Sequence, residues 1–378
     1  MDGNRRSAWF GLRMLCAALF LVGLISAQEE TQLDLSSGKK IFETACAACH
    51  GGDTKGAPDT TVGFAKPKTF PDFTQCDQTT PELNKDWKAT ILEGGHGRGF
   101  SKIMPAFMDA LTSKQIDMVI EYLRQACPGN TWPRGELNLP RPAVTEKAFP
   151  EDETVLTSSV NLTGLPSVSN LVTYEKRIGA RNQLELTLPF GFNRASPGRW
   201  YGGIGDITLA FKRVLFVNNR SGTILTLFGE TSVPTGDTKR GFGVSTPILE
   251  PSLAFAQILP RESFFQFQAG TEQPVDTQKA PRAAYSRFAI GKTFRQEMSV
   301  GRMWTPMVEF LADRDFTTGA KVNWDILPQM QVTISRRQHV RLDFGVRIPA
   351  TNTQGRSIQG VMYVLWDWFD GGLFEGWR

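Results

Sequence analysis

Residues 46–50 read Cys-Ala-Ala-Cys-His, a C-x-x-C-H motif. Two thiols one short turn apart can each form a thioether bond with one vinyl group of a haem, and the next residue is then placed to ligate the iron. A C-x-x-C pair alone also occurs in redox dithiols and in zinc sites. The added histidine favours one covalent haem c, with Cys46 and Cys49 as thioether residues and His50 as an axial ligand.

A second axial ligand is expected from the stretch Met104-Pro105-Ala106-Phe107. A thioether on a loop supported by proline suits the sixth position of the iron, and His/Met ligation raises the reduction potential. His96, in the glycine-rich stretch 94–99, is the alternative sixth ligand, and Met108 and Met118 come after it. A methionine can equally serve to fill a hydrophobic core.

Helices are predicted on both sides of these motifs. Ser36 or Ser37 can cap a helix that delivers the two haem cysteines at its end. Thr112 and Gln115 have the spacing of a capping box, and the apolar residues after them recur at helical intervals. The intervening residues 52–87 are rich in Gly, Pro, Thr and Asp, which predicts a long loop packed on something large.

Residues 36–127 resemble a single-haem class I cytochrome c. The resemblance rests on the C-x-x-C-H motif, the Met-Pro-Ala-Phe loop, Gly38 and Phe42 before the motif, and Tyr122 and Leu123 on the last helix. It implies a small all-α domain over residues 28–127, in which the first and last helices cross and close the haem pocket.

The cysteine count leaves one further pair. The chain has five cysteines, of which Cys16 lies in an N-terminal apolar stretch and Cys46 and Cys49 are assigned to haem. Cys76 and Cys127 remain, and they are not part of the basic cytochrome pattern. In an oxidising compartment a disulfide is their expected use, with two free buried thiols as the alternative.

The N-terminus has the features of an export signal. Arg5, Arg6 and Arg13 precede the apolar run 14–25, and Ser26-Ala27 offers small residues for cleavage. An uncleaved anchor is the alternative, although the apolar run is short for a membrane span. We expect a cleaved signal peptide over residues 1–27, and export agrees with haem attachment outside the cytoplasm.

A proline-rich stretch follows the haem domain. Residues 128–153 contain five prolines, mixed charges and almost no periodicity. This composition predicts a semi-rigid, extended linker. The sequence leaves open whether the linker is disordered or docked.

The remaining residues, 154–378, alternate apolar and polar side chains with a period of two, most clearly over 339–348. Such alternation predicts strands with one apolar face. The candidate strands are about ten residues long, which matches a membrane-crossing strand. About twelve are expected, near 154–163, 169–178, 183–193, 204–217, 224–235, 248–259, 263–275, 283–295, 304–316, 324–336, 339–350 and 357–369.

Two further features favour an antiparallel outer-membrane β-barrel over a soluble sandwich or lipocalin-like barrel. Short turns, near 179–182, 218–223, 260–262 and 337–338, alternate with longer polar loops, near 194–203, 236–247, 276–282 and 317–323. Aromatic residues gather at strand ends, as in interfacial girdles: Trp200, Tyr201, Trp304, Trp324, Trp366 and Trp368. An even strand count places both barrel ends in the periplasm.

The barrel half resembles outer-membrane barrels of the meta-pathway phenol-degradation type. The resemblance rests on residues 175–190, on Gly203-Ile204-Gly205-Asp206-Ile207 and on Val233-Pro234-Thr235-Gly236. It implies a channel or carrier for small, often apolar compounds. The predicted fold class is therefore multidomain, a small all-α domain followed by an all-β transmembrane barrel.

The combination resembles the fused cytochrome–porins of bacteria. It implies an outer-membrane electron-transfer protein with its haem domain in the periplasm, linking periplasmic carriers to a partner at or across the membrane, such as a small-molecule or extracellular electron donor or acceptor. The alternative is a small-molecule channel with the haem domain as a redox cap or docking module. Ligation by Met104 argues against a peroxidase-like enzyme. A net charge of +4 without a basic run gives no sign of nucleic-acid binding.

Overall fold

The computed structural model describes residues 33–67, 70–129, 131–195, 198–295 and 303–367. The expected signal peptide and Trp368 lie outside these residues. The N-terminal part is helical: α2 Gly38–Ala45, α3 Ala47–His50, α4 Cys76–Thr79, α5 Asn84–Glu93 and α6 Ser113–Arg124, with a 3₁₀ turn, η1 Gly95–Arg98. The predicted loop over 52–87 is wrong in part, because α4 and the first turn of α5 lie within it.

The first and last helices of this domain, α2 and α6, pack across each other. The Ser37 side chain caps α2, and Thr112 with Gln115 forms the predicted capping box of α6. The buried core between them consists of Ile41, Phe42, Leu111, Ile116, Val119, Ile120 and Leu123. Gly38 permits the close approach, since a Cβ atom there would lie 1.9 Å from the carbonyl oxygen of Met118.

A disulfide joins Cys76 of α4 to Cys127, three residues after the end of α6, with the Cα atoms 5.5 Å apart. It closes a loop of 51 residues. Cross-links over loops of this length stabilise a fold mainly by restricting the unfolded chain. The long segment between the haem motif and α6 is therefore tied to the end of the domain.

The C-terminal part is a closed antiparallel barrel. Its strands are β1 Glu153–Asn161, β2 Ser167–Ile178, β3 Asn182–Ala195, β4 Arg199–Ile204, β5 Ile207–Asn218, β6 Thr223–Val233, β7 Ile248–Leu259, β8 Ser263–Pro274, β9 Ala283–Lys292, β10 Trp304–Asp315, β11 Asn323–Thr333, β12 Val340–Pro349 and β13 Gln359–Asp367. Strands that follow each other in the chain pair with each other, except that β5 pairs with β3 and not with β4; the pairing of β1 with β13 closes the barrel.

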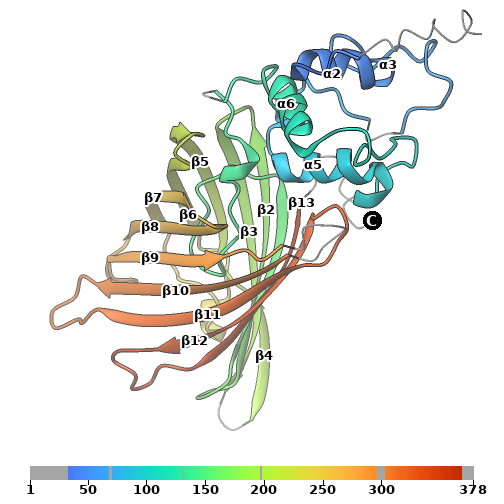
Figure 1. The fold of residues 1–378 in the computed structure, drawn as a ribbon. Helices are drawn as coiled ribbons and strands as arrows, with labels where there is room; N and C mark the ends of the chain where they lie inside the picture. The colour runs from blue at the N-terminus through green and yellow to red at the C-terminus, as the bar shows by residue number, and fades with distance from the viewer. Residues whose placement is uncertain (1–32, 68–69, 130, 196–197, 296–302, 368–378) are drawn as a thin grey trace, which may run out of the picture.

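The barrel has twelve strand positions, as predicted, because β4 and β5 occupy one position between them. The first half of β3 pairs with β5 and its second half with β4. Residues 194–203 are expected to form a loop, and this prediction is wrong for the described part of the range: residues 194–195 belong to β3 and residues 199–203 to β4, which extend beyond the other strands (Figure 1). Gly191 and Gly203 lie opposite each other in this pairing, and a Cβ on Gly203 would lie 2.2 Å from the ring of Phe242.

The barrel is apolar outside and polar inside. In β5, for example, Leu209 and Phe211 are exposed, whereas Thr208, Ala210 and Lys212 are buried. Large exposed apolar side chains recur on nearly all the strands, including Leu171, Leu184, Leu227, Leu249, Ile290, Phe344 and Met362. An apolar surface this extensive is unusual for a protein that meets only water.

Residues 138–152, here called the luminal strap, run through the inside of the barrel. Glu309 of β10 accepts hydrogen bonds from the amides of Val144 at 3.1 Å and Thr145 at 2.7 Å. Other strap–wall bonds connect Tyr363 and Gln331 to the carbonyl of Arg141, Ala143 to Gln329, Glu146 to Gln268, Thr226 to Ala148, and Glu151 to Gln183. The proline-rich linker is therefore docked.

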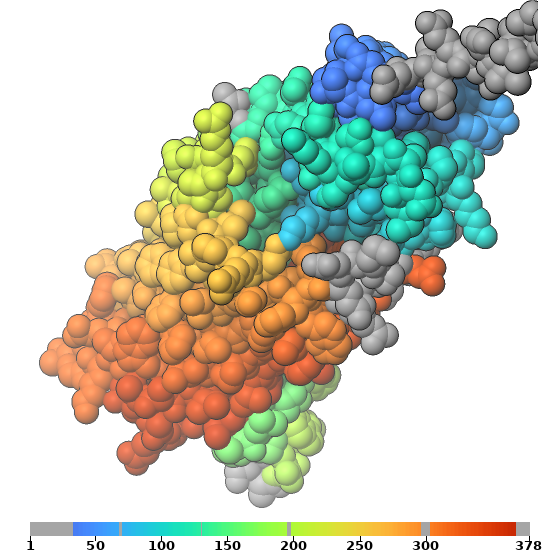
Figure 2. Space-filling model, in the orientation of Figure 1, coloured from blue at the N-terminus to red at the C-terminus, as the bar shows by residue number. Residues whose placement is uncertain are grey.

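Apolar strap residues pack on the wall beside a cavity of about 280 Å³, which Leu139 and Pro140 of the strap help to line. Leu139, Ala148 and Phe149 are buried in one cluster with wall residues Val214, Ile224, Ala254, Ala256, Phe264 and Met307. The haem domain adjoins the end of the barrel where the strap enters (Figures 1 and 2). It contacts the short turns there: Arg177 donates to the carbonyl of Asp77, Asn219 to that of Gly129, and Lys85 pairs with Glu262.

Among the described residues, no helix combines the length and the apolar character needed to cross a membrane.

Replacing Gly38 with alanine tests the helix crossing. Alanine ordinarily favours a helix by about 1 kcal/mol over glycine, but here its Cβ would overlap the carbonyl oxygen of Met118. We expect a net destabilisation of about 1–3 kcal/mol, measured as a lower midpoint when haem absorbance is followed during thermal unfolding. Gly63→Ala is the control, since a Cβ there meets nothing within 4 Å. Equal midpoints for the two variants would contradict the crossing.

Candidate functional site

The C-x-x-C-H motif begins where α2 ends. The amide of Cys46 donates to the carbonyl of Phe42 at 2.9 Å and so closes α2, and the amide of His50 donates to the carbonyl of Cys46 at 2.9 Å. Cys49 and His50 lie on the single turn of α3, which ends at Gly51 with φ +73°. Both cysteines are free and half-buried, so their thiols are not paired with each other.

Two aromatic residues of the following segment surround His50. The imidazole stacks on Phe70, with ring centroids 5.0 Å apart, and lies 5.5 Å from the ring of Phe73. Burial lowers the pKa of His50 to about 4, because the charged imidazolium is disfavoured there. The imidazole is therefore neutral at physiological pH, which is the form that ligates metals.

The Met104 segment is attached to the end of α5. The amide of Gly95 donates to the carbonyl of Met104 at 3.1 Å, and the amide of Phe107 donates to that of Ile91 at 3.0 Å. A Cβ on Gly94 would lie 2.9 Å from the Met104 carbonyl, so this approach also needs a glycine.

The competing ligands differ in placement. Met104 is half-buried, whereas His96 is exposed on η1 and Met108 is 44% exposed. Met118 lies on α6 and packs against the helical core. Burial thus favours Met104 over His96 and Met108, and Met118 is set apart by its packing in the helical core; the role of Met104 as sixth ligand stays a prediction.

The residues around the motif fit a covalently held haem. Nδ1 of His50 is buried and has no hydrogen-bond partner among the described residues. Burial raises the pKa of the Cys46 thiol to about 11, with a smaller contribution from Cys49, which fits a sulfur that is held uncharged in an apolar pocket. Cys46 and Cys49 would hold the porphyrin, and His50 and Met104 the iron. The haem would supply one-electron redox chemistry between Fe(III) and Fe(II).

The site includes a buried charge pair that sequence patterns did not identify. Arg98 of η1 donates from Nη1 to Oδ1 of Asp86 on α5 at 2.8 Å, and both side chains are more than nine-tenths buried. The two residues are twelve apart in the chain and belong to different elements, so no periodicity links them. The pair braces the turn that precedes Met104.

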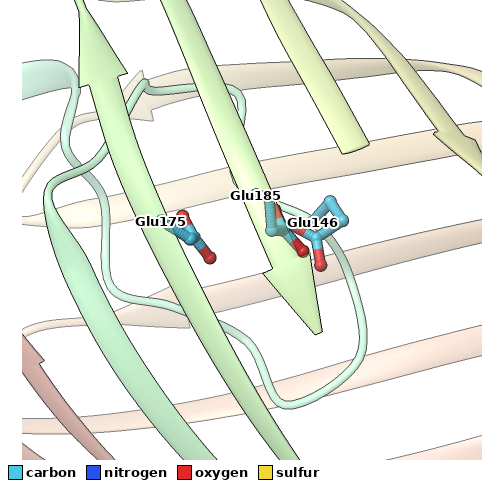
Figure 3. Close-up of side chains that lie close together, drawn as sticks. All are labelled: Glu146, Glu175 and Glu185. Atoms are coloured by element: carbon cyan, nitrogen blue, oxygen red, sulfur yellow. The ribbon is translucent and has the colours of Figure 1, made fainter. Parts of the chain in front are cut away.

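A second polar cluster lies inside the barrel. Carboxylate oxygens of Glu146, Glu175 and Glu185 lie within 4.8 Å of one another (Figure 3). Arg141 of the strap donates to Glu175 at 2.6 Å and to Glu153 at 2.8 Å, and it pairs with Glu146 at 3.5 Å. The guanidinium already supplies positive charge there, so the cluster is part of the strap's attachment to the wall.

Replacing Met104 tests the sixth ligand. In Met104→Ala the reduction potential of the haem should fall, because a thioether ligand favours Fe(II). His96→Ala should leave the potential unchanged, since that side chain is exposed. Potentiometric titration of the purified proteins measures both. A changed potential in His96→Ala with an unchanged potential in Met104→Ala would assign the ligand to His96.

Solved structures offer only distant similarity to the barrel. An outer-membrane channel from Pseudomonas putida F1 is 13% identical, with a TM-score of 0.42 over 61% of this chain and 100% of that one. The KdgM porin is 10% identical, with a TM-score of 0.36 over 57% of this chain and 99% of that one. The barrel architecture rests on the strand pairing described above.

The haem domain has closer relatives. The family model for cytochrome c matches residues 35–126. Cytochrome c6 of Tetradesmus obliquus is 31% identical over 100 residues, which are 26% of this chain and 98% of that protein. Cytochrome c6 of Chlorolobion braunii is 30% identical over 102 residues, 27% of this chain and 100% of that protein. Through its N-terminal domain, the chain belongs to the cytochrome c family.

Proposed function

We propose that this protein is a c-type cytochrome anchored in the outer membrane, with one covalent haem that passes electrons between periplasmic carriers and a partner at that membrane. The observation that carries the proposal is the placement of the cytochrome domain. It sits on the short-turn end of a barrel that is apolar outside and has a strap packed against its inner wall. Electron transfer is the chemistry of the cytochrome c family, and the barrel would hold this chemistry at the outer membrane.

The barrel exterior supports insertion into a bilayer. Its strands are mostly 9–14 residues long, and strands of about ten tilted residues span an apolar band about 25 Å tall. Outer-membrane barrels keep short turns on the periplasmic side and long loops outside. The cytochrome domain contacts the short turns, so by this rule it lies in the periplasm.

The luminal strap favours an anchor over an open channel. A channel needs a continuous aqueous path, whereas the strap bonds to the wall on several strands and buries Phe149 among wall residues. The cytochrome domain covers the strap's side of the barrel as well. In this arrangement the haem serves carriers that reach the periplasmic mouth, and a partner on the other face would need a further electron carrier.

The proposed role is not enzymatic. A peroxidase-like haem needs an open or easily vacated sixth position. The loop that carries Met104 is held by backbone hydrogen bonds to α5 and η1, as described above. This attachment supports a permanently occupied sixth position, which suits simple electron exchange.

A haem-stained gel of the outer-membrane fraction tests the location and the cofactor together. We expect one haem-positive band that migrates faster before boiling than after, since folded barrels resist detergent and a covalent haem survives heating. A Cys46→Ala/Cys49→Ala variant should lose the stain and keep the mobility shift. A haem-positive band confined to the soluble periplasm, without a shift, would contradict the proposal.

Conductance in planar bilayers tests the anchor against the channel. The full chain should give no steady current, because the strap fills the lumen. Glu309→Ala removes the acceptor of the bonds from Val144 and Thr145. Each unpaired buried donor costs about 1–3 kcal/mol, so this variant should show intermittent openings. Steady current through the unaltered chain would contradict the anchor and support the channel.

A further inference from the structure

One barrel turn reaches the part of the cytochrome domain that carries Met104. Residues 334–339 connect β11 to β12, and Arg337 at the tip is only 6% exposed. Its Nε and Nη2 donate to the carbonyl of Gly99 at 3.4 and 3.3 Å. Its guanidinium lies 4.7 Å from the ring centroid of Phe100, within range of a cation–π contact.

The contact is reciprocal and buried. Arg98, already paired with Asp86, donates from Nη2 to the carbonyl of Arg337 at 3.4 Å. Both arginines are only 6% exposed. Charge-assisted contacts are stronger where water is excluded.

Two backbone hydrogen bonds connect this junction to Met104. The amide of Phe100 donates to the carbonyl of Gly95 at 2.8 Å, and the amide of Gly95 donates to the carbonyl of Met104 at 3.1 Å. Gly99, the residue that Arg337 holds, has φ +73° and ends η1. The arginine therefore holds the loop at the point where its backbone turns towards Met104.

The barrel turn itself is firmly built. Oγ of Ser335 accepts from the amides of His339 and Val340, both at 2.9 Å. His339 is bonded to Asp367 at the end of β13, and the amide of Asp367 donates to the carbonyl of His339 at 3.0 Å. Arg337 is thus fixed relative to the barrel wall rather than free to follow the loop.

We propose that Arg337 is a positioning residue for the Met104 ligand, so that docking on the barrel determines how firmly the sixth position of the haem iron is occupied. This inference rests on the proposed ligation by Met104. The contacts from Arg177 to Asp77 and from Asn219 to Gly129 hold the domain at other turns. Loss of the Arg337 side chain should therefore loosen the loop without detaching the domain.

Competition with imidazole measures the effect in the full haem-loaded chain in detergent. A small ligand binds the iron only when the Met104 thioether has left, so its apparent affinity reports the occupancy of the sixth position. Arg337→Ala should raise the apparent imidazole affinity about tenfold, the order expected for lost hydrogen bonds from a charged donor. The apparent imidazole affinity of Arg337→Lys should lie between those of Arg337→Ala and the unaltered chain, since an ammonium keeps the charge but lacks the planar donor geometry of a guanidinium.

Arg336→Ala is the matched control, because the neighbouring arginine on the same turn is exposed. Its imidazole affinity should equal that of the unaltered chain. An unchanged mobility shift before and after boiling confirms that each variant keeps a folded barrel.

The double variant Met104→Ala/Arg337→Ala separates positioning from general loosening. If Arg337 acts through Met104, the double variant should have the same apparent imidazole affinity as Met104→Ala alone. A further tenfold rise in that background, or no effect of Arg337→Ala alone, would overturn the inference. If Met104→Ala itself leaves the imidazole affinity unchanged, the ligand proposal fails instead, and the two failures are thereby distinguished.

Discussion

A barrel with an apolar exterior must satisfy its polar interior from within, and here the luminal strap supplies partners to several of the buried polar groups of the wall. Buried Glu309, Glu175 and Gln183 on the wall each have partners that the strap supplies, either a backbone amide or the guanidinium of Arg141. Unpartnered charges at such depth would cost several kcal/mol each. The strap is also the covalent connection to the cytochrome domain, so the same contacts that fill the lumen keep that domain at one mouth.

The docked strap also determines how the cytochrome domain is held on the barrel. The strap limits how far the cytochrome domain can move, and the short turns then engage it through polar contacts on several sides. One of these turns, around Arg337, meets the loop that carries Met104. The barrel is accordingly more than a tether: it fixes the orientation of the domain and contacts the segment next to its iron ligand.

Local patterns predicted much of this fold. The spacing of C-x-x-C-H, the capping box at Thr112 and the twelve alternating strands are short-range signals, and the corresponding elements are present. The β3–β4 hairpin was mistaken for a loop because its glycines and Pro197 resemble turn residues. Whether the strap is docked does not follow from the sequence, since the wall partners of its backbone groups lie between 32 and 222 residues away. A proline-rich composition also describes a free and a docked segment equally well. Arg98 and Asp86 give no sequence signal because they lie on different elements that share no periodicity. Arg337 gives none because its contact, Gly99, lies 238 residues away.

The most direct test of the account is cysteine labelling in intact cells with a reagent that does not cross the outer membrane. Thr318→Cys lies on an exposed long loop and Lys114→Cys on an exposed face of α6. The account predicts labelling at position 318 in intact cells, and at position 114 only after the outer membrane is permeabilised. Labelling of position 114 in intact cells would place the cytochrome domain outside and contradict the account.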